Sequence, residues 1–141
     1  MKQLFLIILL AVSLNGFTQC TECNSLTEAL KKPEGVKSLI VNGYQHGRLD
    51  SIPASIVLLV NCEILYFTDQ PISQVPAAIG KLQKLKELSF GGCKLEKLPE
   101  EIFTLKYLKE LILFDNAFSE AYIIELKKRV AADMPKTKLM L

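Results

Sequence analysis

Residues 85–105 read LKELSFGGCKLEKLPEEIFTL, and the spacing of their apolar residues decides the fold. The same spacing recurs 23 residues earlier and 23 residues later, and a first copy begins at Val36 with three extra residues between Asn42 and Arg48. The apolar phases of the central copy are Leu85, Leu88, Phe90, Cys93, Leu95, Leu98, Ile102 and Leu105. A proline stands at one phase in three copies, as Pro53, Pro76 and Pro99. The chain is therefore built from a 23-residue repeat.

Each repeat predicts a short strand followed by an irregular return. In the pattern L-x-x-L-x-L, which ends at Leu88 and Phe90, alternate side chains of the strand face inward. The proline suits the start of a helical or extended turn because its φ is already fixed. Ile102, Leu105 and Leu108 recur every three residues, as in a 3₁₀ helix. One repeat cannot bury its own apolar face, so the repeats must stack.

This pattern resembles the leucine-rich-repeat family over residues 36–118, in particular small secreted proteins of the bacterial type. The resemblance implies an α/β solenoid with a short, curved parallel sheet of about five strands. It also implies irregular or 3₁₀ returns on the convex side and a ligand-binding concave face. The concave face is expected to measure roughly 350 Å². A standard protein interface takes ~800 Å² from each partner, so a peptide, a glycan or one loop of a partner is favoured as ligand.

Both ends of the chain carry atypical units that are expected to cap the stack. Residues 19–35 form the amino-terminal cap, in which Ser25 and Glu28 have capping-box spacing and Pro33 ends a short helix. Residues 119–141 form the carboxyl-terminal cap, with a helix expected over residues 120–132. Residues 138–141 repeat the strand pattern and are expected to close the sheet as its last strand.

Residues 1–18 have the features of a secretory signal peptide. Lys2 precedes an apolar run at residues 4–12, which is much shorter than the ~20 residues that cross a bilayer. Small residues favour cleavage after Thr18. The alternative is a lipid anchor on Cys20, but Gln19 is not the small residue that such processing favours. No other run is long enough for a transmembrane segment, so the mature protein is expected to be secreted or to lie in the periplasm or cell envelope.

The outward-facing strand positions predict a binding patch. Tyr66 and Phe114 are large apolar groups on alternate strands, and small residues between them are expected to leave a hollow for a side chain or a sugar ring. Asp69 and Asp115 are expected at the rim, where they would select hydroxyl or cationic groups. The alternative is that all these residues are ordinary strand formers. The predicted ligand-binding residues are Tyr66, Phe114, Ser89, Asp69, Asp115 and Ile112.

The four cysteines fall into two pairs. Cys20 and Cys23 lie together in the cap, where a short disulfide is one possibility; a metal site would need two more ligands, and none is predicted. Cys62 and Cys93 occupy repeat phases that lie about 26 Å apart along a strand. Because a disulfide needs Cα atoms within ~7 Å, these two are expected to be free, buried thiols.

Motifs for catalysis or nucleic-acid binding are missing from the sequence. The formal net charge of +2 is too small to favour nucleic acid as a partner. His46 is the single histidine, and no nucleophile elbow, paired carboxylates, phosphate-binding loop or cofactor motif accompanies it. Lys127 and Lys128 suit the solvated face of a helix near its carboxyl end. The chain is therefore expected to be neither an enzyme nor a cofactor-binding protein.

These observations predict a non-catalytic, extracytoplasmic recognition module that binds a protein segment or a glycan on its concave face. The alternative is an enzyme inhibitor or a structural subunit of an envelope complex. Both functions use the stacked repeats as a binding surface.

Overall fold

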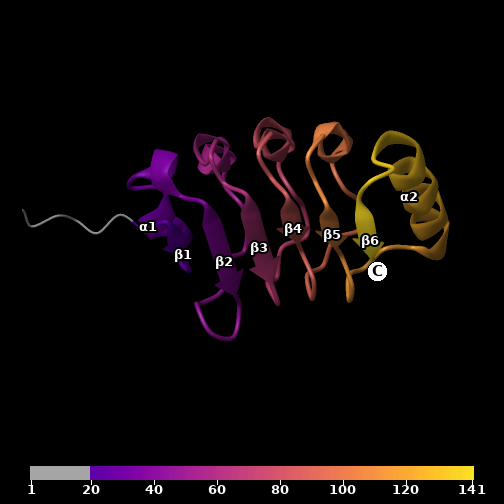
Figure 1. The fold of residues 1–141 in the computed structure, drawn as a ribbon. Coiled ribbons are helices and arrows are strands. Elements are labelled where there is room, and N and C mark those ends of the chain that lie inside the picture. Colours follow the sequence, from indigo (N-terminus) through magenta and orange to yellow (C-terminus); the bar gives the residue numbers. More distant parts are fainter. Residues whose placement is uncertain (1–19) are drawn as a thin grey trace, which may run out of the picture.

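Six parallel strands form one sheet in the computed structural model, which describes residues 20–141 (Figure 1). They are β1 (Glu22–Cys23), β2 (Ser38–Asn42), β3 (Ile64–Thr68), β4 (Glu87–Ser89), β5 (Glu110–Ile112) and β6 (Lys138–Met140). Neighbouring strands are also neighbours in the sequence, and they pair with no shift of register, so Leu39, Leu65, Leu88 and Leu111 stand side by side. The sheet is that of a leucine-rich-repeat solenoid, as predicted. The predicted signal peptide lies outside the described residues.

The returns between strands contain short 3₁₀ helices, which lie in a row beyond the strands in Figure 1. Within the repeats these helices are η2 (Ala54–Leu58), η3 (Ala77–Lys81) and η4 (Glu100–Thr104), and η1 (Pro33–Gly35) lies in the cap. Pro53, Pro76 and Pro99 precede the three repeat helices in extended conformation, with ψ of 154°, 145° and 146°. The repeated proline therefore marks where each 3₁₀ return begins.

The core is a single stack of apolar layers between the sheet and the 3₁₀ helices. The apolar phases of the repeat, such as Leu65, Leu88 and Ile102, are buried along the whole stack. The rings of Phe67 and Phe90 stack with centroids 6.3 Å apart and an interplanar angle of 6°. Each repeat thus supplies one layer and is covered by the next, which is why a single unit would not be stable.

In each repeat, the side chain at the turn after the strand contacts a backbone carbonyl of the preceding repeat. Asn116 Nδ2 donates a 2.8 Å hydrogen bond to the Phe90 carbonyl, and Cys93 Sγ lies 3.3 Å from the Phe67 carbonyl. Gln70 makes the equivalent bond to the Val41 carbonyl. These three side chains satisfy buried backbone groups that the turn leaves without a partner.

The amino-terminal cap contains one strand more than predicted. The prediction of about five strands is corrected to six, because β1 pairs with β2 through Glu22 and Ser38, and Cys23 and Leu39. A disulfide joins Cys20 to Cys23, with Cα atoms 5.3 Å apart. The short helix α1 (Leu26–Ala29) follows, with the Ser25 side chain as its N-cap. A two-residue strand carries no periodic pattern, which explains why the sequence did not predict it.

The carboxyl-terminal cap is the helix α2 (Glu120–Asp133) followed by β6. Ser119 caps the helix by accepting a hydrogen bond from the Tyr122 N–H, and Leu126 and Val130 are buried against the last repeat. β6 then pairs with β5 through Leu111 and Leu139. Across residues 20–141, no helix combines the length and the apolar character that crossing a membrane requires.

Cys62 and Cys93 are free and buried, as the repeat register predicts. Burial raises the pKa of Cys62 to about 11 and also raises the pKa of Cys93. Both thiols therefore stay protonated at neutral pH and act as small apolar core groups.

Candidate functional site

The concave face presents three rows of side chains, each row running across the strands. The register aligns the first row as Glu22, Ser38, Ile64, Glu87, Glu110 and Lys138. The second row is Ile40, Tyr66, Ser89, Ile112 and Met140. The third row lies near the carboxyl ends of the strands and contains Asn42, Thr68, Gly91 and Phe114. We call the second row the apolar row, because four of its five members are apolar or aromatic.

Tyr66 stands in the middle of the apolar row and is held by its neighbour on β4. Its hydroxyl donates a short hydrogen bond to Glu87 Oε2. Desolvation, together with this bond and the charge of Glu87, raises the pKa of Tyr66 to about 12. The ring is half-buried, so it offers a fixed apolar surface with a neutral hydroxyl at its edge.

Phe114 is 46% exposed, but its ring fills the place where the sequence predicts a hollow. A β-carbon built on Gly91 would lie 2.7 Å from Phe114 Cζ, so the ring rests directly on the Gly91 backbone. Ser89 is only 2% exposed and contributes almost no surface. The expected hollow between Tyr66 and Phe114 is therefore corrected to a shallow face that the Phe114 ring closes.

Asp69 and Asp115 lie at equivalent positions of their repeats, and both are turn residues. Their φ angles are 55° and 53°, and Gly92 at the same phase has a φ of 69°. This left-handed conformation is tolerated by glycine, asparagine and aspartate, so the backbone itself accounts for these residue types. Asp69 also accepts a 2.7 Å hydrogen bond from Asn42 Nδ2, which occupies one of its oxygens. Ile112, the remaining predicted residue, is half-buried in the apolar row.

The acidic groups closest to the apolar row are glutamates of the first row. Glu87 and Glu110 face each other on β4 and β5, and Glu22 lies on β1. The binding patch predicted from the sequence did not include them. The sequence could have indicated this acidic row, since Glu87 and Glu110 occupy the same position of the 23-residue repeat.

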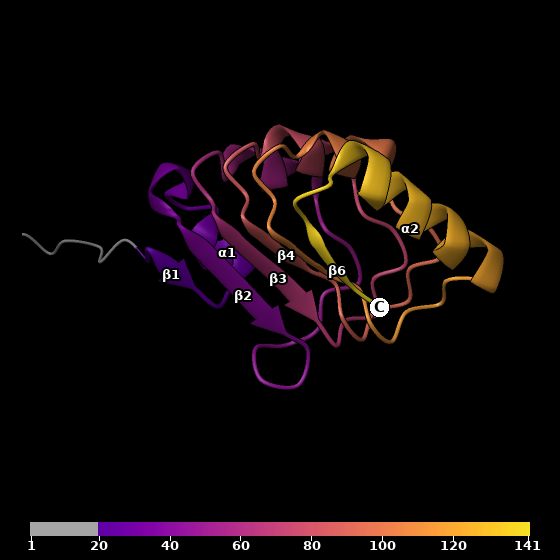
Figure 2. The ribbon, with the colours of Figure 1, turned by 45° about the vertical axis from the view of Figure 1, so that its right-hand side comes forward.

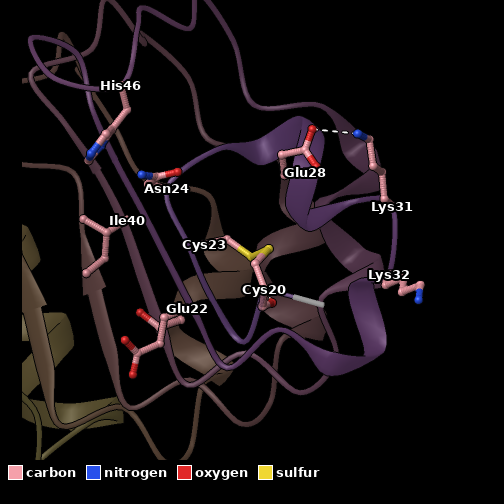
Figure 3. A pocket seen from close by; sticks show the side chains of 10 residues that line it. Cys20, Glu22, Cys23, Asn24, Glu28, Lys31, Lys32, Ile40 and His46 are labelled. Carbon is pink, nitrogen blue, oxygen red and sulfur yellow. Dashed lines mark hydrogen bonds and ion pairs between the residues drawn. A yellow bond between two sulfur atoms is a disulfide. The ribbon is translucent and has the colours of Figure 1, made fainter. Parts of the chain in front are cut away.

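A pocket of about 680 Å³ adjoins the concave face at the amino-terminal cap. In Figure 3, Ile40 of β2 and His46 of the following loop lie on one side, and the Cys20–Cys23 disulfide lies on the other. Ile40 is 38% exposed and supplies an apolar wall. His46 Nδ1 accepts a hydrogen bond from the Asn42 N–H at 3.1 Å, which holds the ring beside the end of β2.

This pocket was missed from the sequence because the cap and the loop come together only through the fold. The loop after β2 carries the three extra residues of the first repeat, and it projects beyond the other strand connections (Figure 2). In the part of the chain that the structure describes, no three His, Cys, Asp or Glu side chains are grouped to hold a metal ion. The pocket lining combines charged side chains, such as Glu22 and Lys31, with the apolar side chain of Ile40.

Comparison with known proteins gives clear structural neighbours. No protein-family model and no curated protein matches the chain. A leucine-rich-repeat protein of Leptospira interrogans matches with 29% identity and a TM-score of 0.70, over 85% of this chain and 29% of that one. The plant peptide hormone receptor RGFR1, solved in complex with RGF2, matches with 22% identity and a TM-score of 0.60, over 77% of this chain and 17% of that one. An internalin, InlF, of Listeria monocytogenes matches with 16% identity and a TM-score of 0.61, over 84% of this chain and 32% of that one.

The chain thus spans about a third or less of the length of each of these neighbours. The likeness to the Leptospira protein covers 85% of this chain, and it agrees with the 23-residue repeat in the sequence. On repeat, register and structural likeness together, this chain has the leucine-rich-repeat fold.

Proposed function

We propose that this protein is a non-catalytic, extracytoplasmic recognition module that binds a segment of a partner protein on its concave face. The observation that carries the proposal is the apolar row beside an acidic row. Ile40, Tyr66 and Ile112 form an apolar strip across β2 to β5, and Glu87 and Glu110 run alongside it. A segment that alternates apolar and basic side chains would match both rows.

The size of the concave face fits a segment better than a whole domain. Six strands at ~4.8 Å spacing and five residues at ~3.3 Å each give a face of roughly 400 Å². This is about half of what one partner buries in a standard interface. A short extended stretch, with one end near the cap pocket, would cover the face. RGFR1, one of the neighbours, was solved with RGF2 bound, which supports a peptide as the class of ligand.

The extracytoplasmic location rests on two independent features. The positively charged start and apolar run of residues 1–12 are those of a secretory signal. The Cys20–Cys23 disulfide is of the kind that persists in oxidising compartments and is rare in the cytosol. A cut after Thr18 would leave the disulfide intact in the mature chain.

The test is selection of short random peptides displayed on phage against the immobilised mature protein. Enriched peptides are then synthesised and titrated against the wild type and the double variant Tyr66→Ala/Phe114→Ala. We expect basic and apolar residues to be enriched, and affinity to fall roughly tenfold or more in the variant, because aromatic side chains dominate small interfaces.

A matched control comes from exposed apolar residues outside the concave face. Leu58 and Val60 lie in or next to η2 and are about half exposed. The double variant Leu58→Ala/Val60→Ala should leave peptide affinity unchanged. If the selected peptides bind the Tyr66→Ala/Phe114→Ala variant as tightly as the wild type, the concave face is not the binding site.

A further inference from the structure

Lysines gather on one flank of the solenoid, where the 3₁₀ helices lead into the strands. Residues 81–86 read KLQKLK and residues 104–109 read TLKYLK, and the leucines of both stretches are buried. The lysine flank consists of the exposed residues Lys81, Lys84, Lys86, Lys106 and Lys109. These two stretches carry no acidic residue, whereas the whole chain has a net charge of only +2. These two stretches therefore carry positive charge only.

The lysine flank has a groove with an aromatic wall. A cavity of about 240 Å³ is lined by Glu63, Lys84, Lys86, Tyr107 and Lys109. Tyr107 is 68% exposed, so most of its ring is available for contact. Pockets for drug-sized ligands measure roughly 300–1,000 Å³, so this groove suits one ring of a longer ligand.

The positive charges of this groove exceed what the protein itself neutralises. Glu63 is the only acidic lining residue, and it pairs with Lys86. The lysines around Glu63, above all Lys86, hold the pKa of its carboxyl below the usual value. Among residues 20–141, Lys109 has no acidic partner, although it stands beside Lys86 on the neighbouring repeat. Adjacent like charges are unfavourable for folding, which points to an anionic ligand as their counterpart.

The backbone N–H groups where the lysine flank enters β4 and β5 are already paired. The N–H groups of Lys86 and Glu87 donate to the Glu63 carbonyl, and those of Lys109 and Glu110 donate to the Lys86 carbonyl. A peptide that binds by strand addition needs such groups unpaired. Side-chain ammonium groups and a flat aromatic ring remain, and these suit an acidic group carried on a sugar ring.

We propose that the lysine flank binds an anionic polysaccharide, with one acidic sugar unit lying against the Tyr107 ring. The acid group of that unit contacts Lys84 and Lys109, and the neighbouring units meet the other lysines of the flank. The groove shares no residue with the three rows of the concave face, so one molecule could bind a protein segment and a polysaccharide at the same time.

The experiment is calorimetric titration of the mature protein with a hexamer of galacturonic acid at low ionic strength, where exposed charges are least screened. A hexamer of glutamic acid has the same number of side-chain carboxylates without sugar rings, and a neutral dextran hexamer has rings without charge. We expect the galacturonic acid hexamer to bind roughly tenfold more tightly than either of the other two. Equal binding of the glutamic acid hexamer, or no binding of the galacturonic acid hexamer, would overturn the proposal.

Variants distinguish the contribution of the Tyr107 ring to affinity from that of the lysine charges. Tyr107→Ala should lower affinity roughly fivefold and Tyr107→Phe should leave it unchanged, because the ring face makes the contact. Lys84→Gln/Lys109→Gln should lower affinity roughly tenfold. Lys127→Gln/Lys128→Gln removes the same charge from exposed positions on α2 and is expected to have less than about a twofold effect. An equal loss of affinity in both charge variants would mean that binding of the hexamer depends only on the net charge of the protein. The groove would then not be a binding site.

Discussion

The ring of Phe114 lies on Gly91, so close that a β-carbon on Gly91 would stand 2.7 Å from Phe114 Cζ. The two residues belong to the third row of neighbouring repeats. The absence of a side chain at Gly91 therefore lets a large aromatic group lie flat on the concave face. This contact also explains how Phe114 is held in place while 46% of it remains exposed.

Replacing Gly91 by alanine should displace the Phe114 ring. We expect Gly91→Ala to lower the free energy of unfolding by about 1–3 kcal/mol through overcrowding. Gly91→Ala made in a Phe114→Ala background should cost much less, because the clash is gone. Denaturant unfolding of the four proteins gives the coupling energy between the two positions. Additive effects would show that the Phe114 ring does not rest on Gly91.

Removal of a central core side chain should be costly. Leu88 is fully buried between the equivalent leucines of β3 and β5. Leu88→Ala is expected to lower the free energy of unfolding by roughly 2–5 kcal/mol, because the layers on both sides limit collapse of the cavity. Val60→Ala, at a half-exposed position, should change it by less than about 0.5 kcal/mol. A similar small change for Leu88→Ala would contradict the stacked core.

The repeat made most of the fold predictable. Leu65, Leu88 and Leu111 recur with one period, so their strands, their register and their burial follow from a single pattern. Pro76 and Pro99 mark the 3₁₀ returns because a proline has a fixed φ wherever it occurs. β1 lacked such a signal, since its two residues are held by pairing with β2 and by the nearby disulfide, which are tertiary features.

The candidate site was predictable only in part. Alternation along a strand correctly places Tyr66 and Ile112 on the concave face. It says nothing of side-chain torsion angles, and these decide that the Phe114 ring covers Gly91. The turn role of Asp69 depends on a positive φ, which the sequence does not reveal by itself.

The backbone at Asp115 gives a test of its turn role. Its φ of 53° favours glycine over any residue with a branched β-carbon. Asp115→Gly should therefore leave the free energy of unfolding unchanged or raise it, and Asp115→Val should lower it by about 1–2 kcal/mol. Chemical denaturation measures both. Equal stabilities of the two variants would show that the conformation at this residue is not a constraint.

Tyr66 should make stability depend on alkaline pH. Its pKa is raised to about 12, whereas an unfolded tyrosine titrates near pH ~10. The folded state therefore holds the proton more tightly, so this contribution to stability is complete below pH ~10 and is lost as the pH rises through about 12. The difference in phenolate absorbance between the wild type and Tyr66→Phe should have its midpoint near 12. A midpoint near pH ~10 would contradict the desolvation of the Tyr66 hydroxyl and its hydrogen bond to Glu87.

The two pairs of cysteines should behave differently towards an alkylating reagent. Cys62 and Cys93 are buried and free, and burial raises the pKa of both thiols, so little thiolate is available in the folded protein. We expect neither to react at neutral pH until denaturant is added, after which both should be labelled. Cys20 and Cys23 should be labelled only after reduction, because they form the disulfide of the cap. Peptide mass mapping distinguishes the four positions. A peptide that links Cys62 to Cys93 would contradict the register of the repeats. Cys62 precedes β3 and Cys93 follows β4, so the two residues lie beyond opposite ends of neighbouring parallel strands.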